Sequence, residues 1–159
     1  MISRRFSEIV IGERFGDSLG VTDWHLLTAS GLFYDFGPNH SNADHSASNR
    51  FGGRIAQGFL TTGMMMGVVG RYFGYSIEAF LESKVRFLAP VLVNESIAIL
   101  WQVESLQTKE AFGGGLIDLR GWCWAGDPER LAVDMSARLA INDEPGPGLH
   151  SLPVESQID

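Results

Sequence analysis

Residues 54–73 constrain the fold of this chain most, because apolar side chains cover nearly the whole circumference of the helix that they predict. A helix that is apolar on all sides belongs in the interior of a domain, so we expect other elements to enclose it. Gly63, Gly67 and Gly70 lie four and three residues apart and therefore share one face of this helix. Because each glycine weakens a helix relative to alanine, we expect this face to let another backbone approach closely.

The second half of the chain changes from a helical period to strand-like alternation. Strands are predicted at residues 14–21, 80–88, 96–106, 116–124 and 131–141. Glycine-containing turns at 113–115 and 126–128 separate the last three of them as hairpins. The pattern predicts an α+β fold with about five antiparallel strands and one enclosed helix.

The length of 159 residues fits a single domain. We expect this domain to span residues 1–142, and residues 143–159, which contain Pro and Gly, to form an extended C-terminal tail. Residues 22–34 begin with a helix-capping residue and an acid, which predicts a helix. Residues 36–53 are rich in Asn, Ser, Asp and His and predict a long loop, and long loops in compact domains are often functional.

The charge and the cysteine content exclude several classes of protein. Twelve Lys and Arg against 19 Asp and Glu give a net charge of −7, which argues against nucleic-acid binding. The single cysteine, Cys123, cannot form an internal disulfide, and residues 1–14 lack the apolar core of a signal peptide. Residues 55–70 are apolar but too short to span a membrane. We therefore expect a cytoplasmic protein that binds neither nucleic acid nor membrane.

Asp35 and His40 form the clearest candidate pair for chemistry. They flank the sequence F-G-P-N at the beginning of the polar loop, and Pro38 restricts the residue before it, Gly37. We expect this turn to hold both side chains near one point. A carboxylate beside an imidazole is a general acid/base pair that works near neutral pH. On spacing alone, a turn aspartate and a surface histidine are the simpler explanation.

The sequence R-F-G-G-R-I-A-Q-G-F-L-T-T-G at residues 50–63 delivers the chain through a glycine-rich turn into the apolar helix. A helix begins with free backbone N–H groups and partial positive charge. Gly58 or a neighbour is therefore a candidate to hold an oxyanion. The alternative is that Gly52 and Gly53 serve only to make a tight turn.

Taken together, Asp35 to His40 followed by F-G-G-R-I-A-Q-G resembles the MaoC-like, (R)-specific enoyl-CoA hydratase family. The pattern of that family is D-x-N-P-x-H, a short loop, and F-G-x-x-I-A-H-G. The later V-R-F-L-A-P-V-L-V-N-E-S-I at residues 85–97 resembles the strand, proline and second strand of the same family.

The resemblance implies a hotdog fold, in which a curved antiparallel sheet of about five strands wraps a long central helix. It also implies a homodimer or higher homo-oligomer that hydrates trans-2-enoyl thioesters of CoA or of acyl carrier protein (ACP), or catalyses the reverse dehydration. In these terms Asp35 and His40 are the catalytic pair, and the N–H of Gly58 binds the thioester oxygen. The CoA thioester is then the substrate, and neither a cofactor nor a metal is expected.

Residues expected to contact the substrate are Gln57, Thr62, Arg54, Lys84 and Arg86, and Arg50 and Arg71 are further candidates for the phosphates of CoA. Three departures from the family pattern bear on the substrate class. Gly37 replaces the usual Asn, Gln57 replaces a frequent His, and a serine of some members corresponds to Gly63, with Thr62 beside it as a substitute.

Three other readings remain open on sequence. Asp35, His40, Asp44 and His45 could form a metal cluster, although their spacing matches no helical ligand pair. A hotdog thioesterase commonly carries an acid on its central helix, and residues 54–73 contain neither Asp nor Glu. A non-catalytic acyl-CoA binding protein would use the same pocket without turnover.

Overall fold

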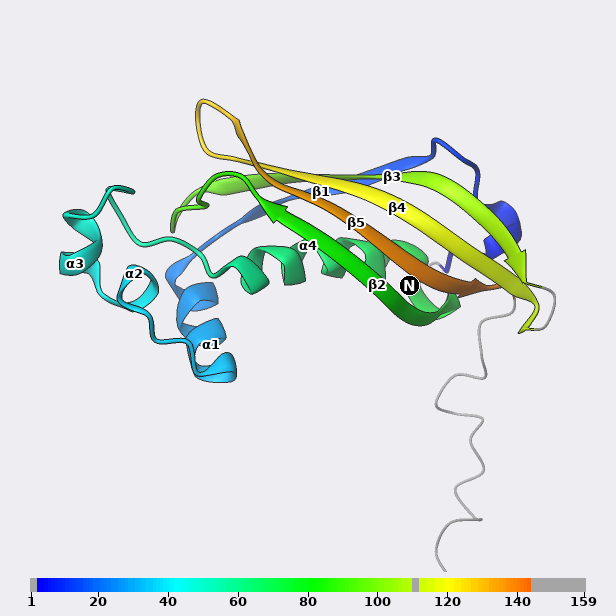
Figure 1. Cartoon of the computed structure of the whole chain (residues 1–159), viewed down its shortest axis with the longest axis horizontal. Helices are drawn as coiled ribbons and strands as arrows, with labels where there is room; N and C mark the ends of the chain where they lie inside the picture. Colours follow the sequence, from blue (N-terminus) through cyan, green and yellow to red (C-terminus); the bar gives the residue numbers. More distant parts are fainter. Residues whose placement is uncertain (1–2, 110–111, 144–159) are drawn as a thin grey trace, which may run out of the picture.

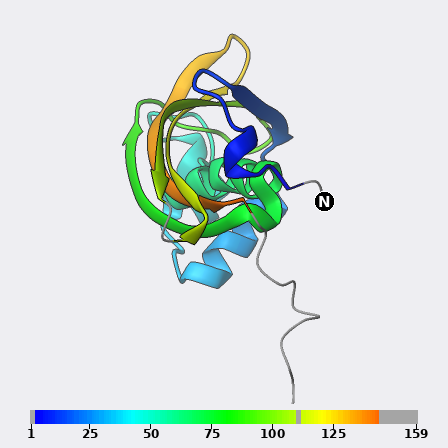
Figure 2. The same ribbon diagram turned by 90° about the vertical axis from the view of Figure 1, so that its right-hand side faces the viewer.

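The computed structural model describes residues 3–109 and 112–143. A five-stranded antiparallel sheet curves around one long helix, α4, at Gly58–Phe73 (Figures 1 and 2). The elements in chain order are η1 (Phe6–Glu8), β1 (Arg14–Gly20), α1 (Asp23–Phe33), α2 (Pro38–Ser41), α3 (Ala43–Ala47), α4, η2 (Gly74–Ser76), β2 (Ile77–Phe87), β3 (Ser96–Lys109), β4 (Gly114–Ala125) and β5 (Arg130–Asn142). This arrangement is the expected hotdog fold of the α+β class.

The strand order is β1-β3-β4-β5-β2, so the two edges of the sheet are β1 and β2. Side chains in β3 alternate between buried and partly exposed, with Ile97, Ile99, Trp101 and Val103 all at most 3% exposed. These residues form the inner face against which α4 packs. The indole N–H of Trp101 donates to the carbonyl of Met65 at 3.0 Å, which ties the centre of the sheet to the centre of the helix.

The predicted strands are all present, but α4 begins later than its apolar pattern suggested. Residues 54–57 are extended instead of helical, because Ala56 N–H donates to the carbonyl of Val91 at 2.7 Å and Ile55 pairs with Leu92. The chain therefore enters the helix from a short β-like segment. As a result Gly58 becomes the first helical residue.

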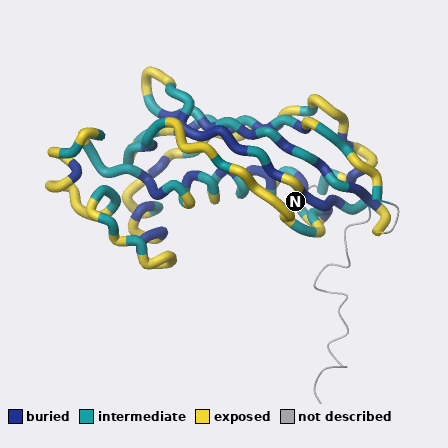
Figure 3. Tube along the Cα trace, viewed as in Figure 1, coloured by how far each residue is buried: buried dark blue, intermediate teal, exposed yellow. Residues whose placement is uncertain are grey.

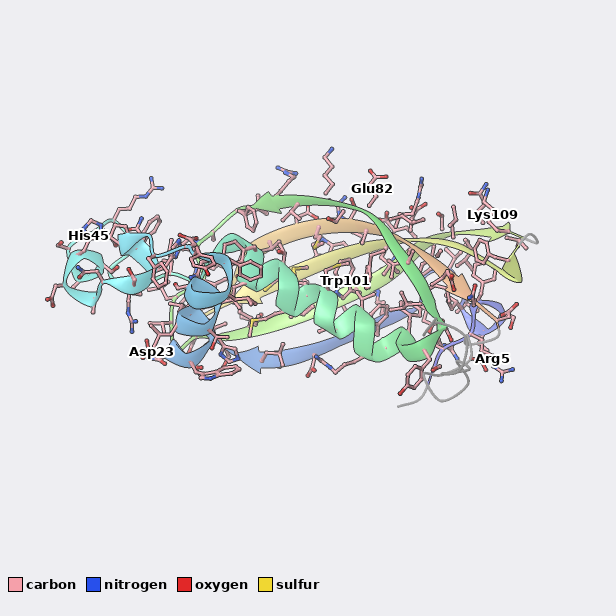
Figure 4. The ribbon with its side chains drawn as sticks, turned by 90° about the horizontal axis from the view of Figure 1, so that it is seen from below. Arg5, Asp23, His45, Glu82, Trp101 and Lys109 are labelled. Carbon is pink, nitrogen blue, oxygen red and sulfur yellow. The ribbon has the colours of Figure 1, made fainter. Side chains whose placement is uncertain are left out.

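The sheet encloses α4 on one side only. Seen from below, α4 lies in front of the sheet, and α1 crosses near its first turn (Figure 4). A Cβ at Gly63 or Gly70 would meet nothing within 4 Å, and at Gly67 only the Arg71 side chain of the same helix. Within the described residues no other backbone approaches these three glycines, so the face that they share is left open. Apolar side chains lie on the face of α4 that packs against the sheet and on the opposite face, and that opposite face is partly exposed.

The polar loop at 36–53 contains two short helices, α2 and α3, which local sequence did not predict. Pro38 starts α2, where its missing N–H costs no hydrogen bond, and Asn42 caps α3 by accepting from the N–H of His45 at 2.9 Å. Together with α1 these helices form an exposed layer at one end of the sheet (Figure 3). The expected tail falls almost entirely at 144–159, outside the described residues.

No helix within residues 3–109 and 112–143 is both long and apolar enough to cross a lipid bilayer. Cys123 is fully buried in β4, and burial raises the pKa of its thiol to about 11. A thiol in this setting stays protonated at neutral pH, as expected of a small core residue.

Candidate active site

Asp35 and His40 lie at one end of the sheet, in the turn that leaves α1. Tyr34 ends α1 in a left-handed conformation with φ of 57°, which redirects the chain toward Asp35. The Oδ1 atom of Asp35 then accepts the N–H of Gly37 at 3.2 Å, which fixes the turn into α2. The Oδ2 atom lies 3.8 Å from Nε2 of His40. The structure therefore brings together the two side chains that the sequence pairs.

The orientation of His40 is fixed from its other ring nitrogen. Nδ1 lies 2.7 Å from the carbonyl oxygen of Ile55, and because a carbonyl only accepts, Nδ1 carries the proton in this contact. In a neutral ring Nε2 is then the free acceptor, and it faces Asp35. The distance of 3.8 Å is too long for a direct hydrogen bond between them.

Gly37 leaves the space between the two side chains open. A Cβ at this position would lie 3.3 Å from Oδ1 of Asp35 and 3.3 Å from Cδ2 of His40. Both contacts are tighter than usual, so a larger residue would press on the pair. The glycine that departs from the family pattern therefore avoids a close contact with both Asp35 and His40.

The first turn of α4 meets His40 across a cavity of about 470 Å³. Gly58 is the first residue of this helix, and its N–H is one of the donors that a helix leaves without an internal acceptor. The ring of Phe87 packs against Gly58, since a Cβ there would lie 2.8 Å from its Cζ atom. The remaining lining is mostly apolar and consists of Arg50, Phe51, Ile55, Ala56, Thr61, Leu88, Ala89, Pro90, Val91 and Val133.

This arrangement places His40 and the first N–H of α4 on the lining of one apolar cavity, while Asp35 lies beside His40 and is not itself part of that lining. The partial positive charge at the start of α4 favours negative charge that develops beside Gly58. Such a site can remove a proton from a bound water and stabilise an oxyanion at the same time.

The predicted substrate contacts are distributed differently from the expectation. Gln57 is 1% exposed, and its amide donates to α1, away from the cavity lining. Thr62 donates its hydroxyl to the carbonyl of Phe59 at 3.0 Å, while its neighbour Thr61 lines the cavity. Thr61 lies three residues after Gly58 and therefore shares its helix face. This spacing in the sequence would have favoured Thr61 over Thr62 as a residue that lines the cavity.

The basic residues that were expected to contact the substrate also lie in different parts of the structure. Arg54 pairs with Asp23 at the start of α1, and Arg71 with Asp17 at 2.7 Å. Lys84 and Arg86 lie on β2 beside a smaller depression, lined with Arg120, Asp134, Met135 and Ser136, that does not include His40. Of the basic candidates, only Arg50 lines the cavity.

Arg50 stacks over the ring of Phe51, with its guanidinium carbon 4.7 Å from the ring centroid. It forms no ion pair within residues 3–109 and 112–143. Over the same residues, no group of three or more His, Cys, Asp or Glu side chains is placed to hold a metal. Asp44 and His45 lie on α3 and do not extend the Asp35 and His40 pair into such a cluster.

Comparison with known proteins identifies the family. The family model described as MaoC like domain matches residues 30–113, more than half of the chain. This chain belongs to the MaoC-like domain family. The match includes Asp35, His40, the beginning of α4 and the whole of β2.

A curated relative of this MaoC-like protein is the (R)-specific enoyl-CoA hydratase of Rhodospirillum rubrum. It is 24% identical over 112 residues, which cover 70% of this chain and 78% of the relative. Among solved structures, the monoamine oxidase regulatory protein of Archaeoglobus fulgidus is 28% identical, with a TM-score of 0.78 over 90% of this chain and 97% of that chain.

An R-hydratase from Pseudomonas aeruginosa, solved without ligand, also has a TM-score of 0.78, at 18% identity. The alignment covers 88% of this chain and 86% of that one. At this identity the likeness shows the shared fold alone.

Proposed function

We propose that this protein is a hydro-lyase that adds water reversibly to trans-2-enoyl thioesters and yields 3-hydroxyacyl thioesters. The observation that carries this proposal is the shared cavity of His40 and Gly58, with Asp35 3.8 Å from the free nitrogen of His40. The family and the hydratase relative support the same reaction class.

In the hydration direction, a water lies between Asp35 and His40 and donates a hydrogen bond to each. Its oxygen attacks the β-carbon of the enoyl group while one of the pair accepts its proton. The electrons of the double bond move toward the thioester carbonyl, and the N–H of Gly58 stabilises the resulting enolate oxygen. A proton from the acid/base pair then adds to the α-carbon, so one water is consumed and no cofactor takes part.

The apolar lining fits an acyl chain, and Arg50 is placed to meet a phosphate of the carrier. Its guanidinium forms no ion pair with the residues that the structure describes, and it lies at a cavity that is otherwise mostly apolar. Both CoA and the phosphopantetheine arm of an acyl carrier protein carry phosphate that such a guanidinium could bind. Because the protein has a net charge of −7, one well-placed cation matters for binding such a group.

We also propose that the protein functions as a homodimer. The edge strand β2 exposes Phe80, Leu81 and Phe87, which are 48%, 53% and 59% exposed. An open strand edge with apolar side chains is a site for pairing with another chain. The end of β2 also borders the cavity, so a partner there would lie close to the active site.

The proposal is tested by incubating the purified protein with crotonyl-CoA and longer or branched enoyl-CoA thioesters. Loss of the enoyl absorbance, with the 3-hydroxyacyl thioester as product, is the expected result. Release of free thiol from saturated acyl-CoA would instead identify a thioesterase. Tight binding of acyl-CoA without reaction on any enoyl thioester would identify a binding protein.

A further inference from the structure

Gln57 is a buried polar residue that the proposed chemistry does not use. Its Nε2 atom donates to Oγ of Ser30 at 2.9 Å and to the carbonyl of Leu26 at 3.3 Å. Both acceptors belong to α1, and residues Gln57 and Ser30 are each 1% exposed. The Oε1 atom of Gln57 has no hydrogen-bond partner within the described part of the chain.

A buried amide with an unpaired oxygen lowers stability relative to an apolar residue of similar size. The helical hydrogen bonds of α1 do not depend on Gln57, because a helix satisfies its internal carbonyls itself. A residue that lowers the stability of the fold is typical of a position where the function requires that residue.

The place of Gln57 in the chain indicates what that function is. It directly precedes Gly58, the proposed oxyanion donor, while α1 ends two residues before Asp35. Two residues upstream, the carbonyl of Ile55 holds the ring of His40. Residues 55–58 therefore contact His40 through Ile55 and α1 through Gln57, and they end at the proposed oxyanion donor.

Two other contacts also link α1 to this region, but both are nearer the surface. Arg54 pairs with Asp23, whose side chain is 52% exposed, and Phe33 packs edge-on against Phe59 with 4.5 Å between ring centroids. Gln57 supplies the buried, directional contact. Hydrogen bonds of this kind restrict relative movement more than ring contacts at an exposed surface do.

We propose that Gln57 is a positioning residue, which holds α1 to the start of α4 and thereby sets Asp35 relative to the N–H of Gly58. The inference rests on the proposed hydratase function for its kinetic consequences. It replaces the expectation that Gln57 touches the substrate.

The kinetic test compares Gln57→Leu, Ser30→Ala and the double variant on crotonyl-CoA. Gln57→Leu is expected to lower kcat about tenfold and leave KM within about twofold, since the reacting groups shift while substrate contacts stay. Ser30→Ala should lower kcat in the same direction, and the double variant should be no slower than Gln57→Leu, because both changes remove one interaction. Gln57→His should recover most of the rate if its ring N–H reaches Ser30.

Asp23→Asn is the matched control, because it removes the charge from the surface ion pair between the same two segments and should leave kcat unchanged. Losses that add in the double variant, or a raised KM at constant kcat, would overturn the inference. If Gln57→Leu does not fold, Ser30→Ala, which removes only the acceptor hydroxyl, decides the question through the same kcat and KM values.

A second readout separates this inference from the proposed function. In ¹⁵N-labelled protein, Gln57→Leu or Ser30→Ala should shift the amide resonances of Asp35 and Gly58, and Asp23→Asn should not. If the wild-type protein hydrates no enoyl thioester, the proposed function fails, and these resonances still report whether Gln57 positions the two groups. Unchanged resonances in both variants would refute the positioning role.

Discussion

The Nε2 atom of His40 lies 3.8 Å from the Oδ2 atom of Asp35, and no proton lies between them when the ring is neutral. The contact of Nδ1 with the carbonyl of Ile55 determines this, because it places the ring proton on the far side. Two acceptors at this separation repel each other slightly but together accept both hydrogens of one water. This geometry supports the proposal that the pair binds and activates a water molecule.

Removing either member of this pair should remove most of the activity. We expect Asp35→Asn and His40→Ala each to lower the rate of crotonyl-CoA hydration at least about a hundredfold, the usual contribution of a positioned acid or base. The matched controls are Asp44→Asn and His45→Ala on α3, which should keep turnover. Wild-type turnover in the purified Asp35→Asn, His40→Ala double variant would show that these residues are not catalytic.

The role of the Gly58 N–H can be tested by deleting that group alone. Proline suits the first position of a helix, and Gln57 already has the extended conformation, with φ of −60° and ψ of 142°, that a following proline requires. Gly58→Pro should lower kcat about 10²–10³-fold, as loss of one oxyanion donor does. Gly58→Ala is the control, because it also adds a Cβ against Phe87 but keeps the N–H. Equal rates for the two variants would argue against an oxyanion role.

The parts of this structure that the sequence predicts well are those set by local pattern. Alternation specified the strands, and the Pro38 turn specified that Asp35 and His40 meet, because only four residues separate them. The sequence predicts the start of α4 four residues too early. Apolar periodicity is a local signal and contains no information on the hydrogen bond between Ala56 and Val91, which are 35 residues apart.

The substrate contacts were harder to predict, because they depend on partners that are distant in sequence. Arg54 is 31 residues from Asp23 and Arg86 is 48 from Asp134, so their ion pairs were not visible in local pattern. Which of two adjacent threonines faces the cavity depends on how α4 is rotated against the sheet. Residues next to each other on a helix point about 100° apart, so a shift of one residue exchanges Thr61 for Thr62.

Arg50 should affect binding of the carrier more than chemistry. We expect Arg50→Ala to raise KM for crotonyl-CoA about fivefold to tenfold with kcat nearly constant, because it removes a contact equally present in ground and transition states. The crotonyl thioester of N-acetylcysteamine, which has no phosphate, should show no such change. Arg14→Ala, on β1 and hydrogen-bonded to Gln102, is the control for lost positive charge. An equal rise in KM for both thioesters would place Arg50 away from the phosphates.

Charge on the exposed edge of β2 should prevent dimerisation. Leu81 is 53% exposed there, and Leu81→Lys should shift the protein from dimer to monomer in light scattering coupled to size exclusion, because lysine on an edge strand opposes pairing. Val10→Lys, at a position 59% exposed and outside the sheet, should leave the dimer intact. A Leu81→Lys protein that remains dimeric would assign the interface to another surface, such as the exposed side of α1.

The cluster of Arg4, Glu13 and Tyr72 should make stability depend on pH in acid. Burial alone would raise the pKa of Glu13, but hydrogen bonds from Arg4 and Tyr72 outweigh it, and the net effect lowers that pKa below its ordinary value of 4.5. A lowered folded-state pKa means that the carboxylate stabilises the fold above about pH 4.5 and loses this contribution as the pH falls through the folded value.

Glu13→Gln should therefore lower the free energy of unfolding by about 1–2 kcal/mol at pH 7, a range reduced because Arg4 is partly exposed. Urea titrations of both proteins should show this difference shrinking as the pH falls below about 4.5, because the Glu13 carboxylate becomes protonated and is then as uncharged as glutamine. A difference that stays constant down to pH 3 would show that the ionised carboxylate contributes nothing to stability.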